Sequence, residues 1–83
     1  MKKEKVKYIG MPRAQILKFI KTFTDKHKIP PSKQEVADAL ECNVNNITHH
    51  YNILRDMGLI DLKPRMSRGV FLKIKANKLI SNL

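Results

Sequence analysis

Residues 32–58, SKQEVADALECNVNNITHHYNILRDMG, decide the fold of this chain. Two stretches with helical spacing of apolar residues are separated by residues 41–43, which leave room only for a turn. The first stretch begins with a capping box, in which the Ser32 hydroxyl accepts from the Glu35 N–H and the Glu35 carboxylate accepts from the Ser32 N–H. Asn43 is a good N-cap for the second stretch. The pattern therefore predicts a helix-turn-helix.

The longer helix of this pair is expected over residues 44–57. Gly58 is the natural residue to close it in the left-handed conformation. At about 100° per residue its side chains separate into two faces. The broad apolar arc contains Val44, Ile47, His50, Tyr51, Ile53, Leu54 and Met57. The shorter helix before the turn is marked by an apolar stripe of Val36, Ala37 and Leu40.

A further helix is expected upstream, over residues 12–26. Pro12 suits a first helical position, because its missing N–H would have no intrahelical partner there. The segment Ile29-Pro30-Pro31 ends this helix, since a residue before proline is disfavoured in the α region. The apolar stripe of the helix is Ile16, Leu17, Ile20 and Phe23.

After Gly58 the apolar period changes from 3.6 to 2, which predicts strands over residues 59–62 and 70–75. Residues 63–69 join the two strands in a loop that contains proline and glycine. The fold class is therefore mainly α with a small β-hairpin: a three-helix winged helix-turn-helix, with residues 63–69 as the wing.

One small domain is all that 83 residues allow. We assign residues 1–11 to a basic N-terminal arm, residues 12–75 to the winged helix-turn-helix domain, and residues 76–83 to a C-terminal tail or linker. A short helix is an open alternative for the last segment. The expected hydrophobic core is Ile16, Leu17, Ile20, Phe23, Val36, Leu40, Ile47, Tyr51, Leu54, Leu62 and Phe71.

The charge of the chain favours a polyanionic partner. Seventeen Lys and Arg residues against seven Asp and Glu leave a net charge of +10 at pH 7. Such an excess favours nucleic acid over an acidic membrane surface or an acidic protein. The alternatives are a codon bias toward lysine and solvated lysine faces without a partner. The single cysteine excludes an internal disulfide and fits a reducing compartment, so we expect a cytoplasmic, nucleoid-associated protein.

Residues 29–40, IPPSKQEVADAL, resemble the PPT-x-x-E-I-A-x-x-L stretch of the LexA DNA-binding domain family. Further likeness covers residues 16–20 in the first helix, 50–54 and 58–60 around the third, and Ser67-Arg68-Gly69-Val70 in the wing. The resemblance spans about residues 12–72 and implies the fold and DNA binding. Residues 43–49 differ from the LexA recognition sequence, and no protease domain or catalytic Ser/Lys pair follows. SOS operator specificity and self-cleavage are therefore not implied.

The polar face of the third helix holds the candidates for contact with bases: Asn45, Thr48, His49 and Asn52, with Asn43 at its cap. Asparagine can bond adenine bidentately, threonine can meet a thymine methyl, and histidine can donate to guanine N7. The alternative is an ordinary solvated face, which usually carries Glu and Lys in i, i+4 pairs. Asp56 would repel phosphates, so we expect the helix to enter a groove by its N-terminal end.

Phosphate contacts are expected at two places. Ser32 and Lys33 begin the second helix, where N–H groups and the helix dipole favour an anion, although a cap and a solvated lysine explain both residues. Arg65, Ser67 and Arg68 lie in the wing, where arginines can enter the minor groove or clamp phosphates. A merely soluble loop is the alternative for the wing. The lysines of residues 1–11 form a basic arm or remain solvated charge.

We predict no enzyme, no cofactor and no metal site. His49 and His50 point about 100° apart on a helix and cannot easily share one ion with Cys42. The leading function is sequence-specific binding of double-stranded DNA, by a transcriptional regulator or its DNA-binding domain. The alternatives are a winged-helix protein-interaction module and a non-specific DNA-binding replication or phage accessory factor. We expect no membrane partner and a monomer in solution, which pairs on DNA or belongs to a longer protein.

Overall fold

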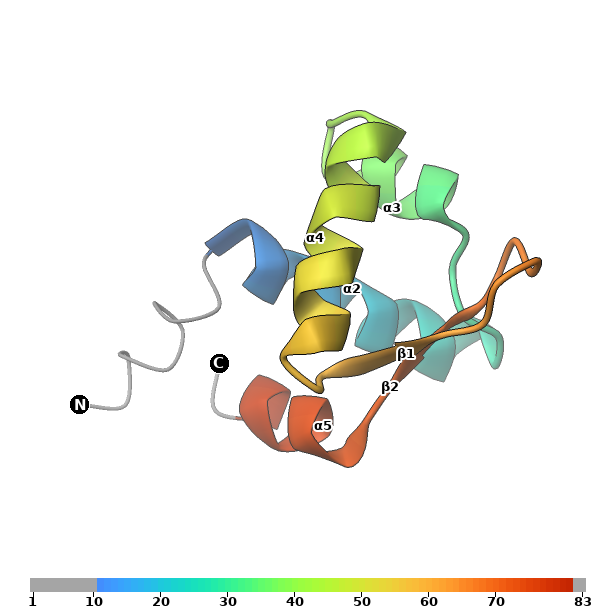
Figure 1. Ribbon diagram of the computed structural model, residues 1–83. Helices are drawn as coiled ribbons and strands as arrows, with labels where there is room; N and C mark the ends of the chain where they lie inside the picture. The colour runs from blue at the N-terminus through green and yellow to red at the C-terminus, as the bar shows by residue number, and fades with distance from the viewer. Residues whose placement is uncertain (1–10, 82–83) are drawn as a thin grey trace.

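The computed structural model describes residues 11–81, which form four helices and one β-hairpin (Figure 1). The basic arm predicted for residues 1–11 lies outside the described residues except for Met11, which begins the first helix. The elements in chain order are α2 (Met11–His27), α3 (Lys33–Ala39), α4 (Val44–Asp56), β1 (Ile60–Leu62), β2 (Val70–Leu72) and α5 (Ile74–Ser81). The mainly helical winged helix-turn-helix is confirmed, and a further helix, α5, follows the wing in the sequence.

The N-termini of α3 and α4 have the predicted caps. The Ser32 hydroxyl accepts from the Glu35 backbone N–H at 3.1 Å, and the Glu35 carboxylate accepts from the Ser32 N–H at 2.9 Å. The Asn43 side chain accepts from the backbone N–H of Asn46 at 3.0 Å. These contacts satisfy N–H groups that have no partner inside their own helices. The capping box and the Asn43 cap are confirmed.

The end of α4 is closed by Gly58, as predicted. Gly58 has φ +77°, its N–H donates to the Arg55 carbonyl at 2.9 Å, and the Leu59 N–H donates to the Leu54 carbonyl at 3.0 Å. This pair of bonds is the Schellman arrangement. It turns the chain directly from α4 into β1.

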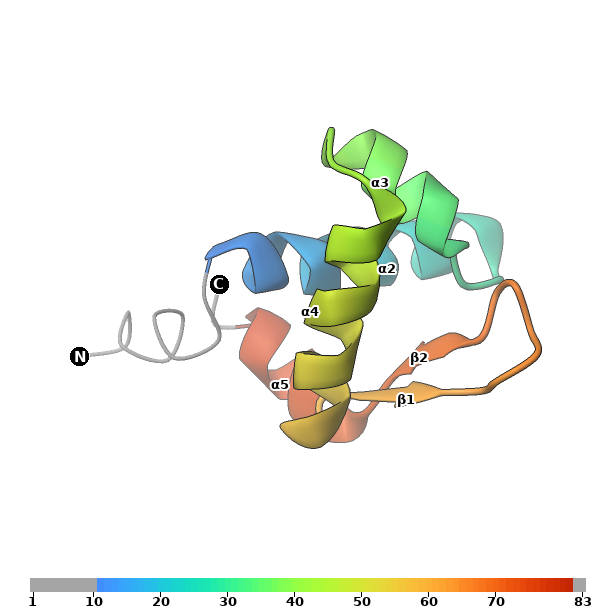
Figure 2. The same cartoon turned by 45° about the horizontal axis from the view of Figure 1, so that its top comes forward.

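The wing is an antiparallel hairpin of two three-residue strands, with Ile60 paired to Leu72, Asp61 to Phe71 and Leu62 to Val70. Beyond the strands the Lys63 N–H donates to the Gly69 carbonyl at 2.8 Å. Figures 1 and 2 show that the wing loop extends beyond the strands, beside the segment that joins α2 to α3.

The prediction of a strand over residues 70–75 was wrong at its C-terminal end, because α5 begins at Ile74. Leu72, Lys73, Ile74 and Lys75 alternate like a strand, but no partner strand continues beyond the pair Ile60–Leu72. The chain instead forms a helix that packs on α2 and buries Ala76 completely. The tail-or-helix alternative is thereby resolved in favour of a helix over most of the predicted tail.

The core lies where α2, α3, α4 and the base of the hairpin meet. Phe71, predicted to be in the core, is 39% exposed. Successive strand residues face opposite sides, so the inward positions of Val70 and Leu72 place Phe71 outward, opposite Asp61. The predicted core residues Phe23, Leu40 and Leu62 are half-buried. The fully buried members include Ile16, Leu17, Ile20, Val36, Ile47, Tyr51 and Leu54.

Candidate nucleic-acid interface

An exposed polar face runs along α4. Asn45, His49 and Asn52 are exposed and Thr48 is half-buried, while the opposite face packs Ile47, Tyr51 and Leu54 into the core. In Figure 1 α4 lies in front of α2, so this element stands at the surface of the domain. The face offers neutral hydrogen-bonding groups over the N-terminal part of the helix.

Asn46 belongs to the same exposed surface but was not among the predicted contacts. Its position three residues before His49 is the spacing of neighbours on one helix face, and that spacing was the signal available in the sequence. Asn43 is exposed as well, and its side-chain oxygen serves the cap of α4. The amide NH₂ of Asn43 takes no part in that cap.

A basic cleft of about 290 Å³ lies between the start of α3, the end of α4 and the wing. It brings together the predicted residues Lys33, Arg65 and Ser67, and it adds Arg55 and Lys63, which were not predicted as contacts. None of its lining residues, all within residues 11–81, is acidic. The complete lining is Pro31, Lys33, Tyr51, Arg55, Leu62, Lys63, Pro64, Arg65, Met66, Ser67, Gly69 and Val70.

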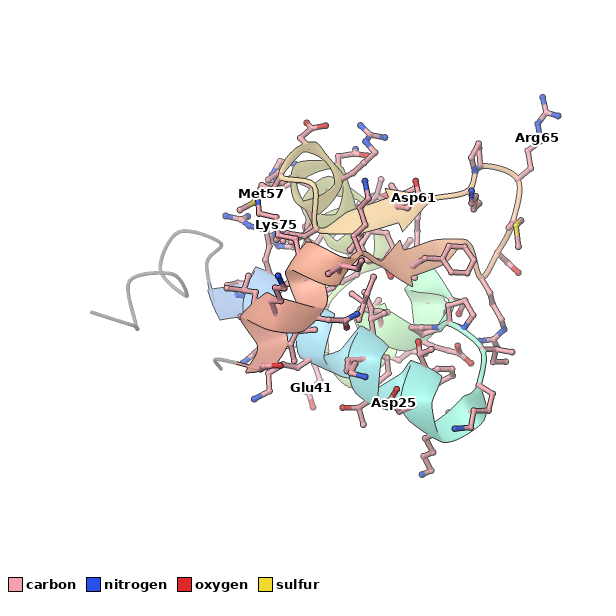
Figure 3. All side chains as sticks on the ribbon, turned by 90° about the horizontal axis from the view of Figure 1, so that it is seen from below. Asp25, Glu41, Met57, Asp61, Arg65 and Lys75 are labelled. Carbon is pink, nitrogen blue, oxygen red and sulfur yellow. The ribbon has the colours of Figure 1, made fainter. Side chains whose placement is uncertain are left out.

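The cations of this cleft are weakly paired. Arg55 lies 3.6 Å from the Asp56 carboxylate and Lys63 lies 3.6 Å from that of Asp61, with more than half of each side chain exposed. Exposed ion pairs of this kind contribute little, so they leave both cations able to meet another anion. Arg65 stands at the wing tip, and Figure 3 shows its side chain directed away from the rest of the domain.

Arg68 is placed differently from the expectation for a DNA contact. Its guanidinium donates from Nη1 to Glu35 Oε1 at 2.6 Å and from Nη2 to Glu35 Oε2 at 2.9 Å. A third bond runs from Nη1 to the Pro30 carbonyl at 3.0 Å. The planar fork of arginine matches a carboxylate in this bidentate way. The wing arginine nearest the strand is therefore engaged within the domain.

The electrostatics of this pair follow from its geometry. The Arg68 guanidinium, with help from the Ser32 N–H, lowers the pKa of Glu35 from 4.5 to about 2. The bond to Glu35 raises the pKa of Arg68 in turn. Both groups are thus charged at neutral pH, and each is balanced by the other. Sequence spacing gave no signal for this contact, because the two residues are 33 positions apart.

His50 faces α2 rather than the exposed side of α4. Its Nδ1 lies 3.3 Å from Nη1 of Arg13, in a half-buried position. Burial, together with the charges of Arg13 and His49, lowers the pKa of His50 below 6.5. Within residues 11–81, no three His, Cys, Asp or Glu side chains gather closely enough to hold a metal ion.

A hairpin wing beside a helix-turn-helix, with a polar recognition helix and a basic cleft, defines a winged helix-turn-helix DNA-binding domain. The chain belongs to the family of LexA DNA-binding domains, whose family model, "LexA DNA binding domain", matches residues 8–69. A "LexA repressor" from Roseiflexus sp. (strain RS-1) is 39% identical over 59 residues, which are 70% of this chain and 27% of that relative. The chain therefore matches only about a quarter of the relative's length.

The matched region contains the elements of the interface, since α3, α4 and the wing loop all fall within residues 8–69. Helix α5 lies beyond the matched region. None of the helices in the described part of the chain is long and apolar enough to cross a membrane.

Proposed function

We propose that this domain binds double-stranded DNA with sequence specificity, as a transcriptional regulator or as the DNA-binding domain of one. The observation that carries the proposal is the exposed row of uncharged hydrogen-bonding side chains on α4, next to a cleft lined by four cations. The likeness to a protein named LexA repressor supports the regulatory role.

The N-terminal half of α4 is the element we assign to the major groove. Recognition helices of helix-turn-helix proteins contact base edges mainly through their first residues. Asn45, Thr48, His49 and Asn52 supply donors and acceptors there, with Asn46 added by its exposure. Asparagine gives the most specific contact of this group, because its amide matches the N6 and N7 edge of adenine.

The basic cleft is the element we assign to the DNA backbone. Lys33 lies on one side of the cleft and Lys63 and Arg65 on the other, with the Ser67 hydroxyl also in the wing, so a DNA strand in the cleft would meet cations from both sides. Backbone contacts fix the position of the protein on the duplex and supply most of the salt-dependent affinity. Ser32 can donate its hydroxyl hydrogen to a phosphate while its oxygen remains in the capping box.

One recognition helix contacts only a few base pairs, so useful specificity requires two half-sites. We propose that the domain is a monomer in solution and pairs on DNA, or works within a longer protein. This arrangement would place two copies of α4 about one helical turn apart on the duplex.

Asn45→Ala tests the specificity. We expect selection from random duplexes to yield a preferred site, and the variant to lose about 1–3 kcal/mol of binding free energy on that site because a base-edge contact is gone. On random duplexes the loss should be small. Fluorescence anisotropy titrations at several salt concentrations measure both affinities.

The matched control is Asn77→Ala, which removes an exposed asparagine from α5, on a different element. It should bind both duplexes like the wild type. An equal loss for Asn45→Ala on selected and random DNA would mean that α4 does not contact base edges and would favour non-specific binding. Unchanged affinity of both Asn45→Ala and Arg65→Ala for DNA would favour the protein-interaction alternative.

A further inference from the structure

The wing loop is bonded to the body of the domain by a side chain at its base. Arg68 forms the bidentate pair with Glu35 and donates to the Pro30 carbonyl. Its guanidinium carbon also lies 5.8 Å from the centre of the Phe23 ring. One arginine thus joins the wing to the last turns of α2, to the Pro30–Pro31 segment and to the start of α3.

Ile60 and Val70 anchor the strands of the hairpin in the core, but they do not reach the loop beyond the strands. Each strand is three residues long, and residues 63–67 of the connecting loop are all exposed. The Lys63 N–H bond to the Gly69 carbonyl closes the loop on itself but does not tie it to α3.

The direction of the wing sets the shape of the basic cleft. Lys63 and Arg65 belong to the wing, whereas Lys33 and Arg55 belong to the helices across the cleft. A rotation of the hairpin would move the first two cations relative to the second two. All four can meet one DNA backbone only while the hairpin keeps its angle.

We propose that Arg68 and Glu35 form a positioning pair, which holds the wing at the angle that lets the cations of the cleft bind DNA together, and that neither residue contacts DNA. The inference rests on the proposed DNA-binding function. It adds that Arg68, through its pair with Glu35, determines the orientation of the wing. It also reverses the sequence-based expectation for Arg68, because three of the five guanidinium N–H donors are taken by Glu35 and Pro30 and the charge is balanced by Glu35.

The charge balance of the pair makes the proposal testable by salt dependence. A cation that neutralises a phosphate releases a counterion, and its removal lowers the slope of log K against log salt by about one unit. Arg68 is already neutralised by Glu35. Arg68→Ala should therefore lower the slope only because the cations of the cleft lose their phosphates, and Glu35→Gln, which keeps the charge of Arg68, should lower it as much. Arg65→Ala should lower the slope by removing its own contact.

Glu35→Gln is the decisive variant. Glutamine retains the capping box with Ser32, because its side-chain oxygen can accept from the same N–H. The change removes one negative charge, so electrostatics alone would tighten DNA binding. If the pair positions the wing, binding should instead weaken by about 3- to 10-fold, in the range of couplings between directly bonded residues.

The matched control is Glu41→Gln, which makes the same charge change at an exposed position on the C-terminal side of α3. It should bind at least as tightly as the wild type. Arg68→Lys is the second comparison, since lysine keeps the charge but cannot form the bidentate pair. A positioning role predicts that Arg68→Lys binds nearly as weakly as Arg68→Ala, and a phosphate contact predicts that it binds nearly as tightly as the wild type.

Binding should be measured on random and selected duplexes, with circular dichroism confirming that each variant is folded at the titration temperature. NMR relaxation of the amides of residues 63–67 should show increased mobility in Glu35→Gln and not in Glu41→Gln. The expected weakening occurs on both duplexes, so it can be observed even where no preferred site exists. A missing preference for any site would refute the specificity proposal alone.

Two results would overturn the positioning pair. One is a Glu35→Gln variant that binds as tightly as Glu41→Gln. The other is a loss of about one unit of salt slope in Arg68→Ala with no loss in Glu35→Gln, which would mean that Arg68 itself contacts a phosphate. If Arg68→Ala is unfolded, Arg68→Lys and Glu35→Gln decide the question, because both retain a polar partner at the site.

Discussion

Glu41 and Arg65 adopt a backbone conformation that side chains other than glycine rarely take. Their φ angles are +57° and +72°. At Glu41 this geometry closes α3, with its N–H donating to the Asp38 carbonyl at 3.3 Å and the Cys42 N–H donating to the Ala37 carbonyl at 3.0 Å. At Arg65 it turns the wing tip and leaves the side chain extended. Such strain, kept at an exposed arginine, fits a functional role for that side chain.

Glu41→Gly should stabilise the domain. Glycine takes the left-handed conformation without the roughly 1 kcal/mol cost that a Cβ imposes, and part of this gain is lost to the greater freedom of glycine in the unfolded chain. We expect the free energy of unfolding to rise by about 0.5–1 kcal/mol, measured by urea denaturation. Glu41→Gln keeps the Cβ and should show no such gain. A fall in stability for the glycine variant would contradict this account of the α3 cap.

At the scale of the elements, the wing depends on close approach at Gly69. A Cβ placed there would collide with the carbonyl oxygen of Lys63 and lie 3.2 Å from the Met66 Cβ. The two ends of the wing loop can approach each other because residue 69 has no side chain. This contact sits beside Arg68, so the closing of the loop and its attachment to α3 occur at neighbouring positions.

Gly69→Ala should open the base of the wing. We expect a loss of about 1–3 kcal/mol in unfolding free energy, because backbone atoms must shift to admit the methyl group, together with weaker DNA binding. Gly58→Ala is the control: it meets no atom within 4 Å but keeps φ near +77°, so its cost is strain alone. NMR shift changes should centre on residues 63–70 for Gly69→Ala and on the α4–β1 junction for Gly58→Ala. Identical DNA affinity of the two variants would contradict the role of the wing base.

For the whole molecule, two titrating groups make stability depend on pH in separate windows. The pKa of His50 lies below its usual 6.5, so the unfolded chain binds a proton first and stability falls as pH drops below that value. The pKa of Glu35 is lowered from 4.5 to about 2, so the stability it contributes is present above pH 4.5 and is lost as pH falls toward 2.

His50→Gln should remove the pH dependence of stability below pH 6.5, and Glu35→Gln should remove the dependence below pH 4.5. We expect the wild type to lose unfolding free energy as pH falls below 6.5, because His50 takes up a proton in the unfolded chain, whereas burial and Arg13 disfavour its charged form in the folded domain. Urea titrations at a series of pH values measure this slope. His27→Gln, at an exposed histidine of α2, provides the comparison and should retain it. A wild-type curve that is flat over this range would show that burial does not disfavour the charged form of His50.

Helix boundaries were predictable because their signals are local. The caps at Ser32 and Asn43 and the closing residue Gly58 each depend on bonds within a few positions along the chain. The spacing of apolar residues identified the inward faces of α2 and α4 for the same reason. The length of the second strand was less predictable, because a strand ends where its partner strand ends. The alternation of apolar and polar residues through Ile74 fits a strand, but it also occurs where α5 begins.

The order of helices and strands, the position of the turn and the polar face of α4 thus follow from residue types and their spacing, because the responsible interactions join near neighbours. The direction of the wing, the outward side of Phe71 and the different surroundings of Arg65 and Arg68 do not. Arg68 and Glu35 are 33 residues apart and become neighbours when the hairpin folds back onto α3. Arg65 and Arg68 have the same side-chain chemistry, but only Arg68 forms an ion pair with a carboxylate in the described part of the chain. Which of the two forms that pair depends on the packing of elements that are distant in the sequence.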